Sequence, residues 1–138
     1  MRRIKRTKMN RKPTPRKYNR DVEFEQLYNN FEDLFCHAFW GFEVRPGWFD
    51  LIADFVVKLD SHLRRNPDMM REEYIIMQVK EKFGSLRIYL HSSDFYINSL
   101  IAETEKRAAD SCTICGKKVE KVFGVWSSMC EKHIKEIQ

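Results

Sequence analysis

Four metal-binding side chains crowd the last quarter of this chain. Cys112 and Cys115 form a C-x-x-C pair, and after fourteen further residues Cys130 and His133 form a C-x-x-H pair. Each pair brings two donors together from one tight turn or one helical turn, which is the ligand spacing of structural zinc sites. The alternative is a set of reduced structural cysteines or disulfides. The spacing favours one zinc ion in a closed structural site, because protein side chains supply all four ligands.

The residues around these ligands predict a small finger over residues 111–138. Gly116 fits a turn that aims both sulfurs of the first pair at one point, and residues 119–126 predict a short hairpin. Residues 130–137 predict a helix that places the second pair on one face. A knuckle, a hairpin and a ligand-bearing helix resemble a treble-clef zinc finger.

Nothing in the sequence predicts a catalytic site. Nucleases that share the treble clef need a general-base histidine on the hairpin, and residues 116–129 contain no His, Asp or Asn. Cys36 and His37 are neighbours on a predicted helix and diverge by about 100°, so a buried Cys36 is the better interpretation. His62 and His91 lie near the ends of predicted elements, where surface or capping roles are expected. We therefore expect a protein without enzymatic activity.

The net charge of +5 hides a division of the chain. Residues 1–20 contain ten Lys or Arg and no acid, whereas residues 21–138 contain 15 Lys or Arg against 20 Asp or Glu. Pro13 and Pro15 block a helix through the basic segment, which predicts a disordered arm. Such an arm binds nucleic acid by neutralising phosphates. The predicted phosphate-binding residues are its basic ones: Arg2, Arg3, Lys5, Arg6, Lys8, Arg11, Lys12, Arg16, Lys17 and Arg20.

Other roles of the arm stay open at this point. It could be a solubilising or nuclear-targeting tail, or it could contact the acidic body of a neighbouring copy.

The middle of the chain, residues 21–110, predicts an α+β core. Apolar residues recur at helical spacing in three stretches and alternate in two others, with Gly84 at the turn between the alternating runs. Helices are therefore expected to pack on a small antiparallel hairpin. The expected elements are an amphipathic helix of about four turns from Asp21 to Phe35, a turn-rich link over 41–47, a helix over 48–64, strands over 74–79 and 86–91, and a helix over 94–109 capped by Ser93 or Asp94.

One face of the predicted hairpin mixes aromatic and basic side chains. A face of this kind can stack bases and hold phosphates. The alternative, which we favour from the sequence, is an ordinary solvated face, because a small antiparallel sheet normally leaves one face wet. The side chains concerned are Tyr74, Gln78, Lys80, Arg87, Tyr89 and His91.

Two sequence blocks and the cysteine-rich ending resemble a family of small bacteriophage and prophage proteins. The blocks are Gly41–Ile52, which contains Pro-Gly-Trp-Phe-Asp, and Gln78–Tyr89, which contains Lys-Glu-Lys-Phe-Gly. The resemblance covers roughly residues 31–133 and leaves the basic arm as an addition. It implies a phage source and a shared fold, and it transfers no catalytic residue.

These observations favour a phage-encoded, non-enzymatic, zinc-binding component associated with DNA or RNA, or with a nucleoprotein assembly. The alternative is a protein-binding modulator, an inhibitor or adaptor, that recognises a host factor through its acidic body. Removal of residues 1–20 separates the two, because only the first function depends on the arm.

No membrane association is expected from the sequence. No apolar run approaches the roughly 20 residues of a membrane-spanning helix. No apolar stretch follows the basic N-terminus as it would in a signal peptide. Retained thiolates indicate a reducing compartment, so we expect the cytoplasm, which is that of the host cell if the chain is phage-encoded.

Overall fold

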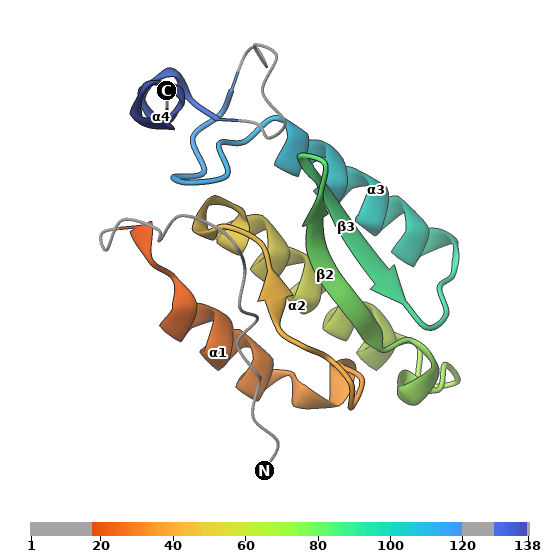
Figure 1. The fold of residues 1–138 in the computed structure, drawn as a ribbon. Coiled ribbons are helices and arrows are strands. Elements are labelled where there is room, and N and C mark those ends of the chain that lie inside the picture. Colours follow the sequence, from red (N-terminus) through yellow and green to blue (C-terminus); the bar gives the residue numbers. More distant parts are fainter. Residues whose placement is uncertain (1–17, 120–128, 138) are drawn as a thin grey trace.

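The computed structural model describes residues 18–119 and 129–137. The fold is α+β, as predicted, with helices packed on one small sheet and the Cys/His segment at one end of the molecule (Figure 1). The sheet has the strand order β1-β2-β3. Strand β1 (Phe42–Glu43) runs parallel to β2 (Ile76–Lys82), and β2 is antiparallel to β3 (Ser85–Leu90). Within the described residues, no helix has the length and apolar character needed to cross a bilayer.

The described residues form four α-helices: α1 (Asp21–Asn30), α2 (Phe49–Arg65), α3 (Phe95–Ala109) and α4 (Glu131–Ile137). Helix α2 has the strongest amphipathic pattern, and its buried face forms the centre of the core. Helix α3 packs on α2 and on β3, so these two helices cover one face of the sheet (Figure 1). Side chains at this junction are almost completely buried, including Ile52, Phe55, Leu59, Val79, Ile88 and Ile97.

The first helix is shorter than predicted. It ends at Asn30, a 3₁₀ turn follows at Glu32–Leu34, and the chain then runs beside β2. Phe35 forms a parallel bridge with Ile76, and the Cys36 amide donates a hydrogen bond to the Ile76 carbonyl at 3.0 Å. The apolar side chains keep helical spacing in the sequence, but these backbone bonds to a distant strand end the helix.

The segment predicted as a turn-rich link contains strand β1. Phe42 pairs with Val79, and Glu43 pairs with Lys80, which adds a third, parallel strand to the predicted hairpin. A strand of two residues has no alternation that a sequence pattern could reveal. The prediction of a two-stranded sheet was therefore wrong by one strand.

A bulge shifts the alternation of β2 away from the predicted one. The pairing with β3 is irregular between Ile76 and Gln78, so one extra residue is accommodated there. As a result Ile76 and Val79 are both buried, and Met77 is exposed. Strict alternation over the predicted strand 74–79 would place Met77 and Val79 on the same face, and the bulge is the physical reason that Val79 is buried while Met77 is exposed.

The turn of the hairpin is shorter than predicted, because β2 continues to Lys82. Phe83 and Gly84 have φ angles of 51° and 82°, and they alone connect the strands. Positive φ at both central residues is characteristic of the two-residue turns whose twist matches that of paired strands. Gly84 therefore has the predicted role, while Lys80 and Lys82 belong to the strand.

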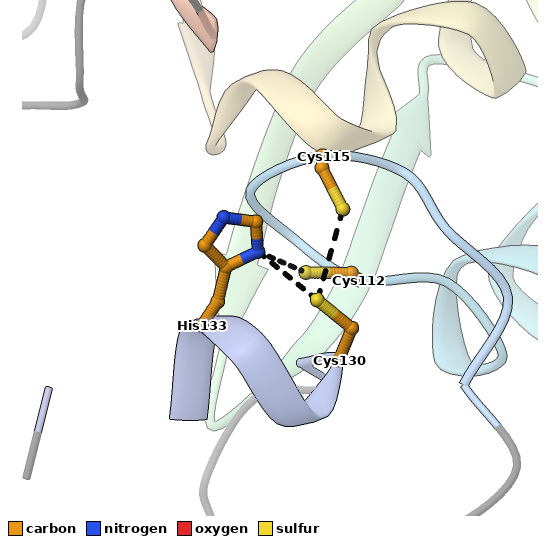
Figure 2. Close-up of side chains that lie close together, drawn as sticks. All are labelled: Cys112, Cys115, Cys130 and His133. Carbon is orange, nitrogen blue, oxygen red and sulfur yellow. Dashed lines mark hydrogen bonds between the residues drawn. The ribbon is translucent and has the colours of Figure 1, made fainter. Parts of the chain in front are cut away.

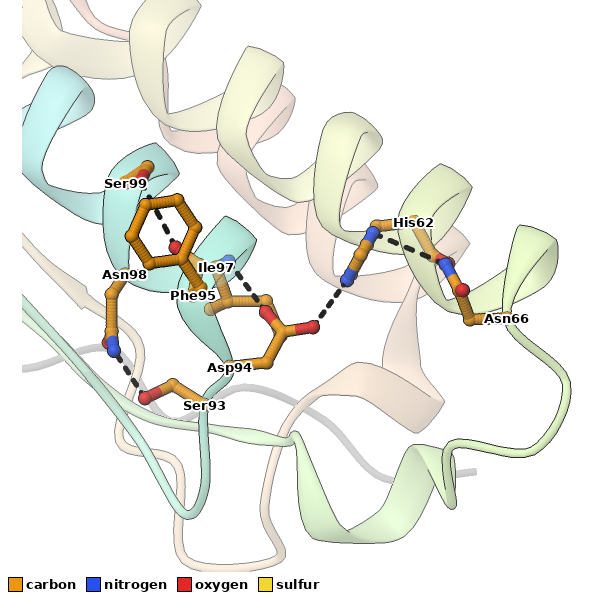
Figure 3. A network of polar contacts seen from close by, with 8 residues as sticks. All are labelled: His62, Asn66, Ser93, Asp94, Phe95, Ile97, Asn98 and Ser99. Atoms are coloured by element: carbon orange, nitrogen blue, oxygen red, sulfur yellow. Dashed lines mark hydrogen bonds and ion pairs between the residues drawn. The ribbon is translucent and has the colours of Figure 1, made fainter.

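Asp94 caps α3, as one of the two predicted alternatives (Figure 3). Its Oδ1 accepts a hydrogen bond from the Ile97 amide at 2.7 Å, and its Oδ2 lies 2.7 Å from Nε2 of His62. Partial burial would raise the pKa of Asp94, but the bonds from Ile97 and His62 hold it below its ordinary value. The histidine thus supports a helix cap at the junction of α2 and α3, a structural role of the predicted kind.

Candidate metal centre

The C-x-x-C pair lies in the turn over residues 111–118 that follows α3, which we call the knuckle. The Gly116 amide donates a hydrogen bond to the Cys112 carbonyl at 2.9 Å, and the Cys112 amide donates one to the Lys117 carbonyl at 2.7 Å. Gly116 has a φ of 80°, a conformation that glycine adopts without the steric penalty of a side chain. The turn predicted at Gly116 is confirmed, and it brings Cys115 back toward Cys112.

The C-x-x-H pair lies at the start of α4. The amides of His133 and Ile134 both bond to the Cys130 carbonyl at 3.0 Å, which forms the first helical turn. Residues three apart on a helix share a face, so the Cys130 and His133 side chains point toward the knuckle (Figure 2). This part of the predicted finger is confirmed, whereas the hairpin predicted over 119–126 falls largely outside the described residues.

All four predicted ligand atoms converge (Figure 2). Nδ1 of His133 lies 3.4 Å from Sγ of Cys112 and 3.1 Å from Sγ of Cys130, and the Sγ atoms of Cys115 and Cys130 are 3.8 Å apart. The four atoms lie within 4.8 Å of one another, and no disulfide joins the cysteines. This group can hold one metal ion, and no other cluster of this kind occurs in the part of the chain that the structure describes.

Burial differs among the ligands and affects their protonation. Burial raises the pKa of Cys115 to about 11, and the nearby Cys112 sulfur adds to the rise. Burial also opposes ionisation of Cys112, but backbone amide hydrogen bonds outweigh it and lower the pKa of this thiol. Cys115 therefore keeps its proton at neutral pH unless a cation displaces it. Metal binding at such a site releases protons, so it strengthens as the pH rises.

The knuckle docks on the 3₁₀ turn Pro46–Trp48 that precedes α2. The Gly47 amide donates a hydrogen bond to the Thr113 carbonyl at 2.7 Å. A Cβ atom on Gly47 would lie 2.1 Å from the Cys112 carbonyl oxygen and 2.5 Å from the Thr113 carbonyl carbon, so the two backbones touch. Only glycine permits this approach. The sequence predicts only a turn-rich link here, and the Pro-Gly-Trp block within it contains the glycine that makes this contact.

Tyr18 is a contact of the site that the sequence analysis did not identify. Its ring meets the ring of His133 edge to face, with the centroids 5.0 Å apart. Its hydroxyl accepts a hydrogen bond from Nζ of Lys132 at 3.5 Å. The base of the basic arm therefore lies against α4 and against one of the four predicted metal ligands.

Arg20 also contacts the folded body. Its guanidinium pairs with Glu23 and with Asp50, and it lies 4.5 Å from the centroid of the Phe49 ring. The predicted disorder of the arm therefore does not extend to this residue. The nine other predicted phosphate-binding residues lie outside the described residues.

The remaining cysteine and histidines stand apart from the metal cluster. Cys36 is 8% exposed and its Sγ donates to the Met77 carbonyl at 3.7 Å, which confirms the prediction of a buried cysteine. His37 and His91 are exposed, and His91 contacts the Glu73 carbonyl through Nδ1 at 3.3 Å.

Comparison with known proteins found no matching family model, no similar curated protein and no matching solved structure.

Proposed function

We propose that Cys112, Cys115, Cys130 and His133 bind one structural zinc ion. Three thiolates and one imidazole are a donor set typical of structural zinc. Zinc bonds of about 2.3 Å to sulfur and about 2.0–2.1 Å to nitrogen, at tetrahedral angles, separate two sulfurs by about 3.8 Å and a sulfur and a nitrogen by about 3.5 Å. The observed separations of 3.8, 3.4 and 3.1 Å lie near these values, and all four atoms lie within 4.8 Å of one another. The four ligands complete the coordination, so the ion would hold the finger and leave no position for a substrate.

We further propose a non-enzymatic function in association with DNA, RNA or a nucleoprotein assembly, in a protein of phage origin. The observation that carries the proposed association with nucleic acid is the concentration of ten basic residues, without any acid, in residues 1–20. A dense cationic segment of this kind binds phosphates through counterion release. Because Arg20 is held by Asp50 and Glu23, we assign the phosphate contacts to the nine basic residues before it. Free thiols suit a reducing compartment such as the host cytoplasm.

The second candidate function is modulation of a host protein by the folded body. The excess of acidic over basic residues in 21–138 supports it, because it provides a surface that can recognise a basic partner. The two functions differ in their dependence on the arm.

Deletion of residues 1–17 should abolish binding to duplex DNA at moderate salt. This deletion keeps Tyr18 and Arg20, so the zinc site and the fold should be unchanged. For the full chain we expect roughly five to eight phosphate contacts, with log affinity falling against log salt by about 0.9 per contact. Fluorescence anisotropy with a labelled duplex at several salt concentrations measures both quantities. Equal affinity and equal slope for the two proteins would show that the arm is not the binding segment, and undiminished capture of a host protein would favour the second function.

Replacement of Tyr18 by alanine should weaken zinc binding by roughly 3- to 10-fold. An edge-to-face ring contact contributes about 0.5–1.5 kcal/mol, and here it orients a ligand ring. Tyr18→Phe is the matched control, because it keeps the ring and removes the hydroxyl that bonds to Lys132. Competition with a chromophoric chelator gives the affinities. If Tyr18→Ala bound zinc as tightly as the wild-type chain, the contact would have no part in holding His133.

A further inference from the structure

The outer face of β2 and β3 presents a defined row of side chains. The strand register places Lys80 opposite Arg87 and Gln78 opposite Tyr89. The residues between them, Val79 and Ile88, are buried against the helices. Helices α2 and α3 cover that inner face (Figure 1). Because side chains alternate between the two faces of a sheet, the four paired side chains lie on the opposite face.

This outer face carries positive charge that the described part of the body does not neutralise. Lys80, Lys82 and Arg87 form no ion pair with any described carboxylate, although Glu43 occupies the position beside Lys80 in the strand register. Glu81 lies between the two lysines in sequence, but it stands opposite Leu86 in the strand register. Leu86 is buried on the inner face of the sheet, so Glu81 belongs to that face and not to the outer one.

Several cations on the helices and in the loop after α2 are instead paired with carboxylates. Lys58 and Arg107 both contact Asp54, at 3.0 and 2.8 Å, and Arg71 is held by Asp60 at 2.8 Å. In a body with more acidic than basic residues, the outer sheet face is thus a local cationic patch whose charges are available to an anionic ligand.

An aromatic ring lies within this patch. Tyr89 is 43% exposed, and Nζ of Lys80 lies 6.0 Å from its ring centroid. A ring flanked by cations can stack a base while the cations contact the phosphates on either side. Duplexes keep their bases stacked inside the helix, so a ring on an open sheet face suits unpaired bases.

We propose that the outer face of β2 and β3 binds single-stranded nucleic acid, with a base stacked on Tyr89 and phosphates on Lys80, Lys82 and Arg87. This inference rests on the proposed association with nucleic acid and assigns it a second surface. The arm would supply binding that does not depend on strandedness, and the sheet face would supply a preference for single strands. The sequence favoured an ordinary solvated face here, and this inference assigns to that face the binding of bases and phosphates instead.

The test compares variants of the full chain on a labelled single-stranded oligonucleotide and on the matching duplex. Tyr89→Ala should weaken single-strand binding by roughly 5- to 150-fold, the equivalent of one lost base stack of about 1–3 kcal/mol, and leave duplex binding unchanged. Tyr89→Phe should bind like the wild type, because the ring remains. Arg87→Ala should reduce the single-strand salt slope by about 0.7. Lys106→Ala, which removes an exposed cation from α3, is the charge control.

The results separate this inference from the function on which it rests. If the full chain bound neither oligonucleotide, both would fail. If it bound both but Tyr89→Ala bound single strands as tightly as the wild type, the sheet-face inference alone would be overturned. Loss with Arg87→Ala and not with Tyr89→Ala would also overturn it, and would indicate a surface for negative charge alone, such as an acidic peptide. Zinc content and far-UV circular dichroism confirm that each variant is folded.

Discussion

Removal of zinc should unfold the finger while α1, α2 and the sheet stay folded. In small zinc modules the free energy of metal binding is also the free energy that keeps the module folded, and it is about 10–16 kcal/mol in zinc-finger peptides at neutral pH. The knuckle and α4 are held together by the ligand cluster, whereas the core has its own buried side chains, such as Ile52 and Leu59. Cys112→Ser removes a buried ligand and should have the same local effect as chelation.

Elemental analysis and hydrogen exchange test this expectation together. We expect one zinc per wild-type chain, a large loss in Cys112→Ser, and fast amide exchange that is confined to the finger and its contacts. Cys36→Ala is the matched control, because Cys36 is a buried cysteine outside the cluster and should leave the zinc content unchanged. A zinc content near zero, with disulfides found by mass spectrometry, would contradict the proposed site.

Substitution of Gly47 by alanine should separate the knuckle from the core. The added Cβ would lie 2.1 Å from the Cys112 carbonyl oxygen, and the neighbouring atoms are backbone, which has little freedom to move. The substitution would also displace the hydrogen bond from the Gly47 amide to the Thr113 carbonyl. Overpacking costs about 1–3 kcal/mol and a lost hydrogen bond about 1 kcal/mol, so we expect a loss of about 3 kcal/mol in the free energy of unfolding.

Denaturant unfolding measures the total loss in the free energy of unfolding, and hydrogen exchange shows which segments are destabilised. Amides of the knuckle and of the turn before α2 should exchange faster in Gly47→Ala, while amides shared by β2 and β3 serve as the internal control. Zinc affinity should fall as well, because the knuckle carries two ligands. Unchanged stability and unchanged zinc affinity would mean that the close backbone contact at Gly47 does not hold the finger on the core.

Local patterns were sufficient for the features that depend on neighbouring residues. Each half of the ligand set comes from residues three apart, so a turn or one helical turn determines its geometry. The same reasoning identified Asp94 as a cap and Gly84 as a turn residue, since both roles involve the adjacent backbone. The helical repeat of α2 was visible because one whole face of it is buried.

Long-range backbone contacts decided what the sequence left undetermined. The early end of α1, strand β1 and the bulge near Ile76 all depend on hydrogen bonds to strands that are far away in the chain, and a side-chain pattern does not report such bonds.

The placement of the metal site was likewise a tertiary result. The sequence by itself determined which four side chains form the candidate metal site, because their spacing and chemistry are local. Only the tertiary structure showed that the backbone of the knuckle contacts Gly47 and that the Tyr18 ring contacts the His133 ring. Both contacts join segments that are distant in sequence. The first requires a glycine without a Cβ where two backbones meet, and the second requires two rings at the right distance and angle. Neither requirement can be recognised in the sequence before the positions of the two backbones are known.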